Sequence, residues 1–347
     1  MARSWDPTAL PIQPGIYINF KRAAAAQING GARGIVAIPL LDYANTASAK
    51  TFYTVASEAE AAELFGLANI DSILLALQGG AKEVLVYTMP DDPVEQDYVD
   101  MREAFDTRGF NVFVFDGEYD ADQQSAVKTW VKRNRDEGKH FIVVIGGDAV
   151  TDADPTAGDA RTTLNSDDYI VNLTVGGTVG DTVYTSSEFA PFIAGDIAGT
   201  PINESVTYDP MPLEDVNKRM TNSQINAALT AGSLVLVHDG VKVKIVSGIT
   251  TSGQKIRSVR ARQAIATDIS RTAADNYIGK LNNNANGQAT LMIAIKAYLE
   301  TLEADGVLTS PAVALDPTRP SVGDSVFLQI SYSETDSIER IFLTINI

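Results

Sequence analysis

The sequence contains no cysteine and only two histidines, His140 and His238. The lack of cysteine excludes disulfides, thiolate metal sites and cysteine nucleophiles. Two histidines also leave little room for zinc sites or for histidine-based acid–base catalysis. Neither histidine has a G-x-S-x-G serine beside it, which a serine hydrolase would need. We therefore expect no catalytic residue, no metal ligand and no cofactor, and we interpret both histidines as ordinary residues at strand ends.

Basic residues are also scarce: 27 Lys and Arg stand against 44 Asp and Glu, and the formal net charge is −17. A chain this acidic repels nucleic acid and anionic lipid at long range. No run approaches the ~18 apolar residues that a membrane-spanning helix needs, and residues 1–6 lack the pattern of a secretion signal. We expect no nucleic-acid binding, no direct membrane binding and assembly in the cytoplasm. A surface adhesin, which would need secretion, is disfavoured.

The middle of the chain alternates apolar strands with helices. The predicted strands are Glu83–Met89, Phe110–Asp116, Phe141–Gly147 and Tyr169–Val175, and the predicted helices are Val94–Thr107, Asp122–Asp136 and Glu188–Ala198. Apolar strands separated by helices are typical of a mostly parallel sheet that is covered on both faces. The polar segment 151–168, with five aspartates, is predicted to be a surface loop. The fold class is therefore α/β for this block, and α+β for the chain as a whole.

An enzyme or nucleotide-binding protein with a doubly wound α/β fold is the alternative that this block leaves open. Gly146 and Gly147 follow a strand, where a nucleotide loop would lie, but Asp148 would repel phosphate and no phosphate-loop motif is present. The aspartates near this segment could collect Ca²⁺, although the EF-hand spacing is missing. We favour a plain turn and a solvated acidic loop. The acidic set is Asp148, Asp152, Asp154, Asp159, Asp167 and Asp168.

The first and last thirds contain further elements. A strand is predicted at Gly34–Leu40, and Ser57 with Glu60 forms a capping box for a helix that ends at Gly66. Thr221 with Gln224 marks another capped helix. Two strands and two long helices are predicted to follow: Leu234–His238, Val241–Val246, Val259–Asn282 and Gly287–Ala304.

Both ends of the chain carry apolar strands. Near the start, Ile16, Ile18 and Phe20 alternate with Tyr17 and Asn19. At the end, a strand around Val326–Tyr332 is followed by a polar turn and by a second alternating segment, Ile341, Leu343, Ile345 and Ile347, which together form a hairpin signal. An apolar terminal strand needs a sheet to join, and an open edge recruits another chain. The pattern is compatible with pairing inside the subunit and with donation to a neighbour, which builds a polymer when the contact does not close.

A cluster of basic residues stands out in this acidic chain. It consists of Lys242, Lys244, Lys255, Arg257, Arg260, Arg262 and Arg271. One interpretation is a solvated helix face; the other, which we favour, is a positive surface that meets an acidic partner. Charge reversal at Arg260 and Arg262 would then weaken assembly.

Four segments together resemble the phage tail sheath family. They are PGIYINFK (14–21), FAPFIAGDIAGTPINESVTYDP (189–210), GSLVLVHDGVKVKIVSGITT (232–251) and YIGKLNNNANGQ (277–288). The resemblance implies an N-terminal arm (1–33), a segment of the inner domain or connector (34–82), an outer α/β domain (83–210) and a C-terminal domain (211–347). It also implies that the terminal strands are exchanged between subunits.

The same resemblance implies a structural subunit of a contractile sheath, found in viruses, bacteriocins and other injection devices alike. Such a subunit forms a helical homopolymer, in stacked rings, around an inner tail tube, and contracts to drive the tube through a target cell envelope. Its expected partners are itself, the tube protein, and the baseplate and tail terminator proteins. Lys255, Arg257, Arg260 and Arg262 are then candidate contacts to the tube or to a neighbour. The expected location is a virion tail or a tail-like particle.

Overall fold

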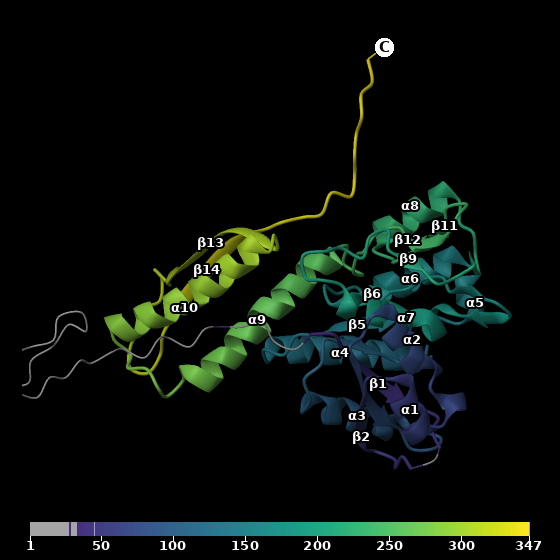
Figure 1. Cartoon of the computed structure of the whole chain (residues 1–347), viewed down its shortest axis with the longest axis horizontal. Helices are drawn as coiled ribbons and strands as arrows, with labels where there is room; N and C mark the ends of the chain where they lie inside the picture. The colour runs from purple at the N-terminus through teal and green to yellow at the C-terminus, as the bar shows by residue number, and fades with distance from the viewer. Residues whose placement is uncertain (1–27, 29–32, 45, 347) are drawn as a thin grey trace, which may run out of the picture.

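The structure, a computed structural model, describes residues 28, 33–44 and 46–346. The predicted N-terminal strand, with Ile16, Tyr17, Ile18 and Phe20, lies outside these residues, as does Ile347. Figure 1 shows a sheet covered by helices at one end of the molecule, and a long helix that leads from it to a helix and a hairpin at the other end. In the described part of the chain, no helix combines the length and hydropathy needed to cross a membrane.

A six-stranded sheet forms the larger part of the protein, with the order β2-β3-β1-β4-β5-β6. Its strands are β1 (Ile35–Leu40), β2 (Phe52–Val55), β3 (Glu83–Thr88), β4 (Val112–Val114), β5 (Ile142–Ile145) and β6 (Ile170–Asn172). All neighbours are parallel except β2, which pairs antiparallel with β3 at the edge. The strands are nearly continuous in buried residues, as a sheet covered on both faces requires. The predicted mostly parallel α/β sheet is confirmed.

The position of β1 differs from the expected domain division. The sequence interpretation placed residues 34–82 in the inner domain or a connector, but β1 lies inside the sheet between β3 and β4. The segment therefore belongs to the α/β block. The apolar run of β1 resembles those of the later strands. Its pairing with β3 and β4 was not predicted, because β1 lies far from them along the chain.

Helices cover both faces of this sheet. Val112 of β4 lies near α7, while the adjacent Phe113 contacts Phe105 of α3 and Trp130 of α4 with ring centroids 5.6 and 5.1 Å apart. Neighbouring residues of a strand point to opposite faces, so α7 and the pair α3 and α4 lie on opposite sides. The helices of this block are α1 (Glu58–Phe65), the 3₁₀ turn η1 (Leu67–Asn69), α2 (Asp71–Gly79), α3 (Glu95–Asp106), α4 (Ala121–Asp136) and α7 (Ser186–Gly199). Ser57 caps α1 as predicted.

Helices α2 and α7 pack backbone to backbone through glycines. A Cβ atom added at Gly195 would lie 2.0 Å from the carbonyl oxygen of Ala76, and one added at Gly79 would lie 2.2 Å from that of Phe192. One turn further on, a Cβ at Gly199 would lie 2.3 Å from the carbonyl oxygen of Gly80. Real Cβ contacts are never this short, so these positions tolerate only glycine without movement of a helix.

The predicted acidic loop at 151–168 is wrong. The segment forms α5 (Ala149–Asp152) and α6 (Pro155–Leu164). The Asp148 and Asp154 side chains accept hydrogen bonds from the first turns of these helices, and Pro155 occupies a first-turn position that tolerates proline. Asp152 is buried and accepts from the Ser186 hydroxyl at 2.5 Å. Two of these aspartates are thus helix caps and a third is a buried acceptor, and no group of acidic or histidine side chains among the described residues is placed to hold a metal ion.

Two small antiparallel sheets extend the α/β block. The first contains β7 (Gly177–Val179), β8 (Thr182–Tyr184) and β10 (Asp215–Val216), and the second contains β9 (Pro210–Met211), β11 (Leu236–His238) and β12 (Val243–Ile245). The capped helix predicted from Thr221 is α8 (Asn222–Ala231). A bridge between Leu173 and Leu234 ties the second sheet to the strand β6.

The remaining elements build a second, smaller core. They are α9 (Ile256–Asn276), α10 (Ala285–Ala304), β13 (Leu308–Leu315) and β14 (Leu328–Glu334). Ile295, Tyr298, Leu299 and Leu302 of the predicted apolar face of α10 are buried there. The helix α9 belongs to both cores, since Ile256 and Val259 pack in the larger one, and Ala261 and Ile265 in the smaller one.

The C-terminal hairpin differs from the predicted one. The strand β14 confirms the alternation seen around Leu328–Tyr332, but it pairs with β13 and not with residues 341–347. Pro311 and a bulge between Thr309 and Ala312 interrupt β13. Proline is rare inside strands, so the sequence did not predict a strand here.

Candidate functional site: the C-terminal arm and its root

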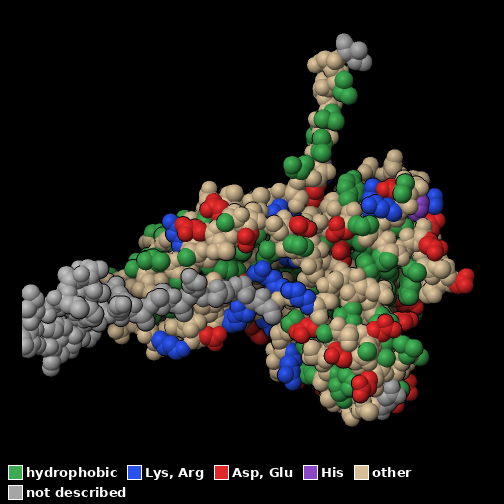
Figure 2. Space-filling view, in the orientation of Figure 1, with side chains coloured by type: hydrophobic (Ala, Val, Ile, Leu, Met, Phe, Trp, Pro, Cys, Tyr) green, Lys and Arg blue, Asp and Glu red, His purple; other side chains and the backbone are tan. Residues whose placement is uncertain are grey.

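Residues 340–346, here called the arm, leave the body as an extended segment (Figure 1). They belong to no helix or strand of the described chain. Ile341, Phe342, Leu343 and Ile345 are 74–90% exposed, and Figure 2 shows hydrophobic side chains along the described part of the projection. Large apolar side chains held in water cost about 1.5–3 kcal/mol each relative to a buried state. A run of them is therefore typical of a segment that binds a partner.

The hairpin of β13 and β14 has two edges to which no other described strand is paired. Within the described residues it is a two-stranded sheet, with Leu308 opposite Glu334 and Leu315 opposite Leu328. Its inner face packs on α10, so the hairpin is held in place although two strands alone are marginally stable. Open strand edges present unpaired backbone donors and acceptors, and so are sites for an added strand.

The arm starts from a fixed segment, residues 334–339, which we call the arm root. The Glu339 carboxylate accepts hydrogen bonds from the Ser205 hydroxyl at 3.1 Å and the Thr207 hydroxyl at 2.9 Å, and it forms an ion pair with Lys255. The Glu339 side chain is only 12% exposed. The end of the body is therefore well anchored up to Glu339, and the exposed arm begins immediately after it.

Two predicted contact residues hold the other end of the arm root. Arg262 forms a bidentate pair with Glu334, at 2.6 and 3.1 Å. Arg257 is buried and donates to the carbonyl oxygens of Thr335 and Gly306 at 2.5 and 2.8 Å. With Lys255, these basic residues of α9 and its start thus contact the chain's own C-terminal segment. Their partners Glu334 and Glu339 were not identified from the sequence, because nothing in the spacing links positions more than 70 residues apart.

Arg260 is also directed inward. It is buried and donates to the carbonyl oxygens of Thr200 and Pro201, at the end of α7. Figure 2 shows Lys and Arg side chains gathered where α9 meets the α/β body. A charge reversal at Arg260 would therefore disturb internal packing before it affected any partner, whereas Lys255 and Arg262 are about one third exposed.

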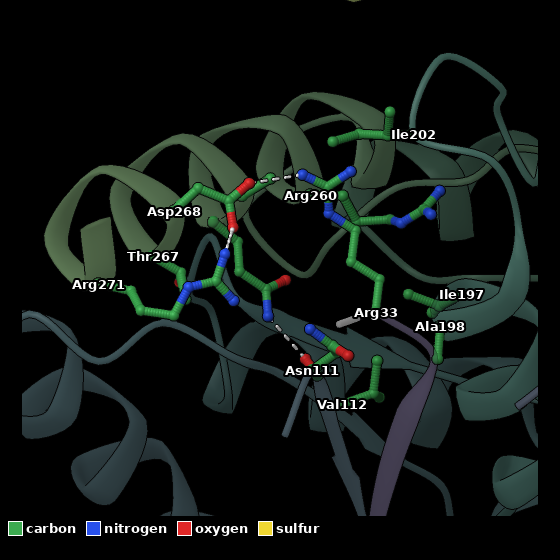
Figure 3. A pocket seen from close by; sticks show the side chains of 12 residues that line it. Arg33, Asn111, Val112, Ile197, Ala198, Ile202, Arg260, Thr267, Asp268 and Arg271 are labelled. Carbon is green, nitrogen blue, oxygen red and sulfur yellow. Dashed lines mark hydrogen bonds and ion pairs between the residues drawn. The ribbon is translucent and has the colours of Figure 1, made fainter. Parts of the chain in front are cut away.

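A small polar cavity lies beside Arg260, between α9 and the end of α7 (Figure 3). Asp268 is its central charge: it pairs with Arg33 at 2.8 Å and accepts from the Tyr298 hydroxyl at 2.6 Å. Burial and this carboxylate raise the pKa of Tyr298. The cavity volume is about 60 Å³, which holds a few waters and is far below the several hundred Å³ of a small-molecule site. The cluster ties α9 to α10 and to Arg33.

A larger cavity, of about 450 Å³, lies at the carboxyl ends of β1 and β4. The strand order reverses there, which is where doubly wound α/β proteins bind ligands. Its lining carries Asp42, Asp71, Asp116 and Glu188. Burial raises the pKa of Asp116, which accepts from the backbone N–H of Leu41 at 2.9 Å. This concentration of acidic groups disfavours a phosphate-bearing ligand.

The glycines that raised the nucleotide alternative have a packing role. A Cβ atom at Gly146 would lie 2.3 Å from the backbone of Ser186, at the start of α7. The N–H of Gly147 donates to the Ser186 hydroxyl at 2.7 Å. The pair lets α7 approach the end of β5 closely.

Both histidines lie at strand ends, as interpreted from the sequence. The Nδ1 atom of His140 is 3.2 Å from the Tyr169 hydroxyl, and burial, with a contribution from Arg135, lowers the His140 pKa. The Nδ1 atom of His238 accepts from the N–H of Gly240 in the following turn. The His238 contact is local to its turn, whereas the His140 contact joins the segments that lead into β5 and β6.

Asp196 gives the fold a predicted pH dependence. Its Oδ2 atom is buried and has no hydrogen-bond partner among the described residues, and burial, reinforced by Asp209, raises the pKa of Asp196 to about 7. The unfolded pKa is ~3.9, so the folded state binds more protons between pH 4 and 7 and stability falls as pH rises through that window. We expect Asp196→Asn to remove about 1–3 kcal/mol of this decline, measured by urea unfolding from pH 4.5 to 8. The pKa of Asp152 is raised to about 6, so the free energy of unfolding of the variant should still fall as pH rises, but by less. An unchanged pH profile would contradict the assignment.

An exposed apolar arm is typical of a protein that assembles with other chains, and so is a hairpin whose edges the described residues leave open. The chain belongs to the phage tail sheath family. The family model for the phage tail sheath protein central domain matches residues 93–251, and the model for the phage tail sheath C-terminal domain matches residues 250–347. The chain is a structural subunit of a contractile tail sheath.

Individual relatives agree with this assignment. The tail sheath protein of Clostridium phage phiCD119 is 23% identical over 313 residues, which cover 85% of this chain and 82% of the relative. A sheath tail protein of Desulfitobacterium hafniense has a similar structure, with a TM-score of 0.76, 20% identity and coverage of 96% of this chain and 100% of that one. The contracted helical sheath of the anti-feeding prophage gives a TM-score of 0.76 at 16% identity, covering 97% and 99%.

Proposed function

We propose that this chain polymerises with copies of itself, in stacked rings, into a helical sheath around an inner tube, and contracts to drive the tube through a target cell envelope. The observation that carries the proposal is the exposed apolar arm on a body whose own hairpin has two edges left open by the described residues. A subunit with both a free strand and a free acceptor edge can link to the next copy without closing, which yields a polymer.

The arm is the donated strand in this proposal, and a hairpin of β13 and β14 in a neighbouring copy is the acceptor. Added strands gain affinity from main-chain hydrogen bonds and specificity from alternate side chains. Ile341, Leu343 and Ile345 share one face of an extended segment, so their burial fixes the register. The second open edge is available to the N-terminal strand, with Ile16, Ile18 and Phe20.

The partners are those of a contractile particle. Similar structures, with TM-scores of 0.75 and 0.76, come from a baseplate of the anti-feeding prophage and from a contracted sheath complex of an extracellular contractile injection system. We infer that this chain meets an inner tube, a baseplate and a tail terminator protein in a virion tail or tail-like particle, assembled in the host cytoplasm. Its role is mechanical, not enzymatic, and it contacts neither nucleic acid nor membrane directly.

Of the four candidate contacts to the tube or a neighbour, we propose Lys255 and Arg262, because these two are partly exposed. Arg257 and Arg260 are both buried, so we infer that they stabilise the packing around this surface and do not contact a partner themselves.

Electron microscopy of the purified chain with its cognate tube tests the proposal. We expect tubes or stacked rings from the full chain, and monomers from a version that lacks residues 340–347 but keeps the arm root. The truncation removes only residues outside the packed body, so unfolding of the body is not a competing cause. Failure of the full chain to polymerise on the tube would overturn the proposal, and polymers from both versions would remove the arm from it.

A further inference from the structure

The contacts of Glu339 connect two parts of the protein at one point. Ser205 and Thr207 lie in the segment after α7, within the matched central domain, while Lys255 lies at the start of α9, within the matched C-terminal domain. Thr207 also accepts from the N–H of Gly248 at 2.9 Å through its hydroxyl, and its own N–H donates to Ser205. The carboxylate therefore joins an already connected network at the boundary of the two domains.

The exposure of the side chains changes at the same point. Glu339 is 12% exposed, although its neighbour Ile338 is 87% exposed and the next apolar residue, Ile341, is 74% exposed. Residues 334, 335 and 339 are all held by the body, through Arg262, Arg257 and the Glu339 network. Beyond Glu339, the large apolar side chains of the arm face solvent within the described chain.

We propose that Glu339 is a positioning residue that latches the arm root to the body, so that the arm pivots after it, at Arg340. That the arm reaches another copy rests on the proposed function; the latch itself does not. A force that acts on the arm is then transmitted to the Glu339 carboxylate. Through the contacts of Glu339 with Ser205, Thr207 and Lys255, it reaches both domains. Hydrogen bonds to a charged group are stronger than neutral ones, which suits a point where force is transmitted.

The absence of cysteine allows a direct test by spin labelling. A reference label is placed on α8 by Ala227→Cys, and the second label is placed either at the root by Ile338→Cys or on the arm by Leu343→Cys. All three positions are exposed, so the labels leave the packing intact. Distances are measured by pulsed electron paramagnetic resonance on dilute monomers. We expect a narrow distribution for position 338 and a broad one for position 343.

Reversal of the charge at position 339 should detach the arm root from the body. Glu339→Lys, which places a cation beside Lys255, is expected to broaden the distribution at 338, and the swap Lys255→Glu with Glu339→Lys is expected to narrow it again. Glu300→Gln, in an exposed ion pair with Lys296 on α10, is the matched control and leaves the distribution narrow. Circular dichroism melting confirms that each variant is folded.

The outcomes separate the latch from polymerisation. A distribution at 338 as broad as that at 343 in the parent chain, or one unchanged by Glu339→Lys, would overturn the latch whatever the chain assembles into. A narrow root in a chain that never polymerises would support the latch and count against the proposed function alone.

Discussion

Leu343→Asp is expected to abolish sheath assembly while the folded monomer is unchanged. Leu343 is 80% exposed in the single chain, so the substitution removes no contact within the body. In an added strand its side chain would be buried against the acceptor, and an aspartate there would bury a charge without a partner, at a cost of several kcal/mol. A loss of that size lowers an association constant by three orders of magnitude or more.

Thr344→Asp is the matched control, because Thr344 lies on the opposite face of the extended arm. It adds the same charge one residue away, and assembly is expected to continue. A third variant, Leu343→Pro, tests the backbone, since proline removes an N–H from the added strand. Sedimentation and electron microscopy in the presence of tube measure the result, and unfolding midpoints should match among all three. Equal loss of assembly from both aspartates would refute the face assignment and indicate a general effect of charge.

Gly195→Ala is expected to destabilise the body by about 3 kcal/mol or more, the upper range for overpacking of a well-packed core. The new Cβ would lie 2.0 Å from the carbonyl oxygen of Ala76 and 2.8 Å from its carbonyl carbon, so no side chain can move aside to relieve the contact. Helix propensity alone predicts the opposite sign, a gain of about 1 kcal/mol from glycine to alanine.

Gly109→Ala is the control for this effect, because nothing lies within 4 Å of its added Cβ and its φ is not positive. Urea unfolding should show a lower midpoint for the Gly195 variant at unchanged slope, and a midpoint near the parent's for the Gly109 variant. A Gly195 variant as stable as the parent would show that α2 and α7 can move apart without cost.

The parts of the fold that could be predicted from the sequence are those with a local signal. The apolar runs of β3 and β5 and the capping residues Ser57 and Thr221 located their elements closely. In contrast, Pro311 hid β13, and the aspartates of 151–168 were interpreted as a solvated loop although Asp148 and Asp154 are helix caps. A capping aspartate is distinguished from a loop aspartate only by the helix that begins after it, and α5, with four residues, is too short to show a helical pattern.

The residues that we propose for assembly also fall into two groups, those with a local sequence signal and those without one. The apolar alternation of Ile341, Leu343 and Ile345 singled out the arm, because the pattern lies in consecutive residues, although the arm forms no strand within the described chain. The arm root depends on Glu339 meeting Lys255 and Ser205 across more than 80 and 130 positions, respectively, and only the folded chain brings them together. The basic residues stood out by their charge in an acidic chain, while their contacts within the chain were beyond sequence reasoning.

The helix α9 sets how a copy of this chain can move. It is 21 residues long, about 30 Å at 1.5 Å per residue, and its side chains are packed into both hydrophobic cores. Rotation of one core against the other would have to break or slide this shared helix, which close packing resists. We therefore expect the two cores of one copy to move together as a single rigid unit.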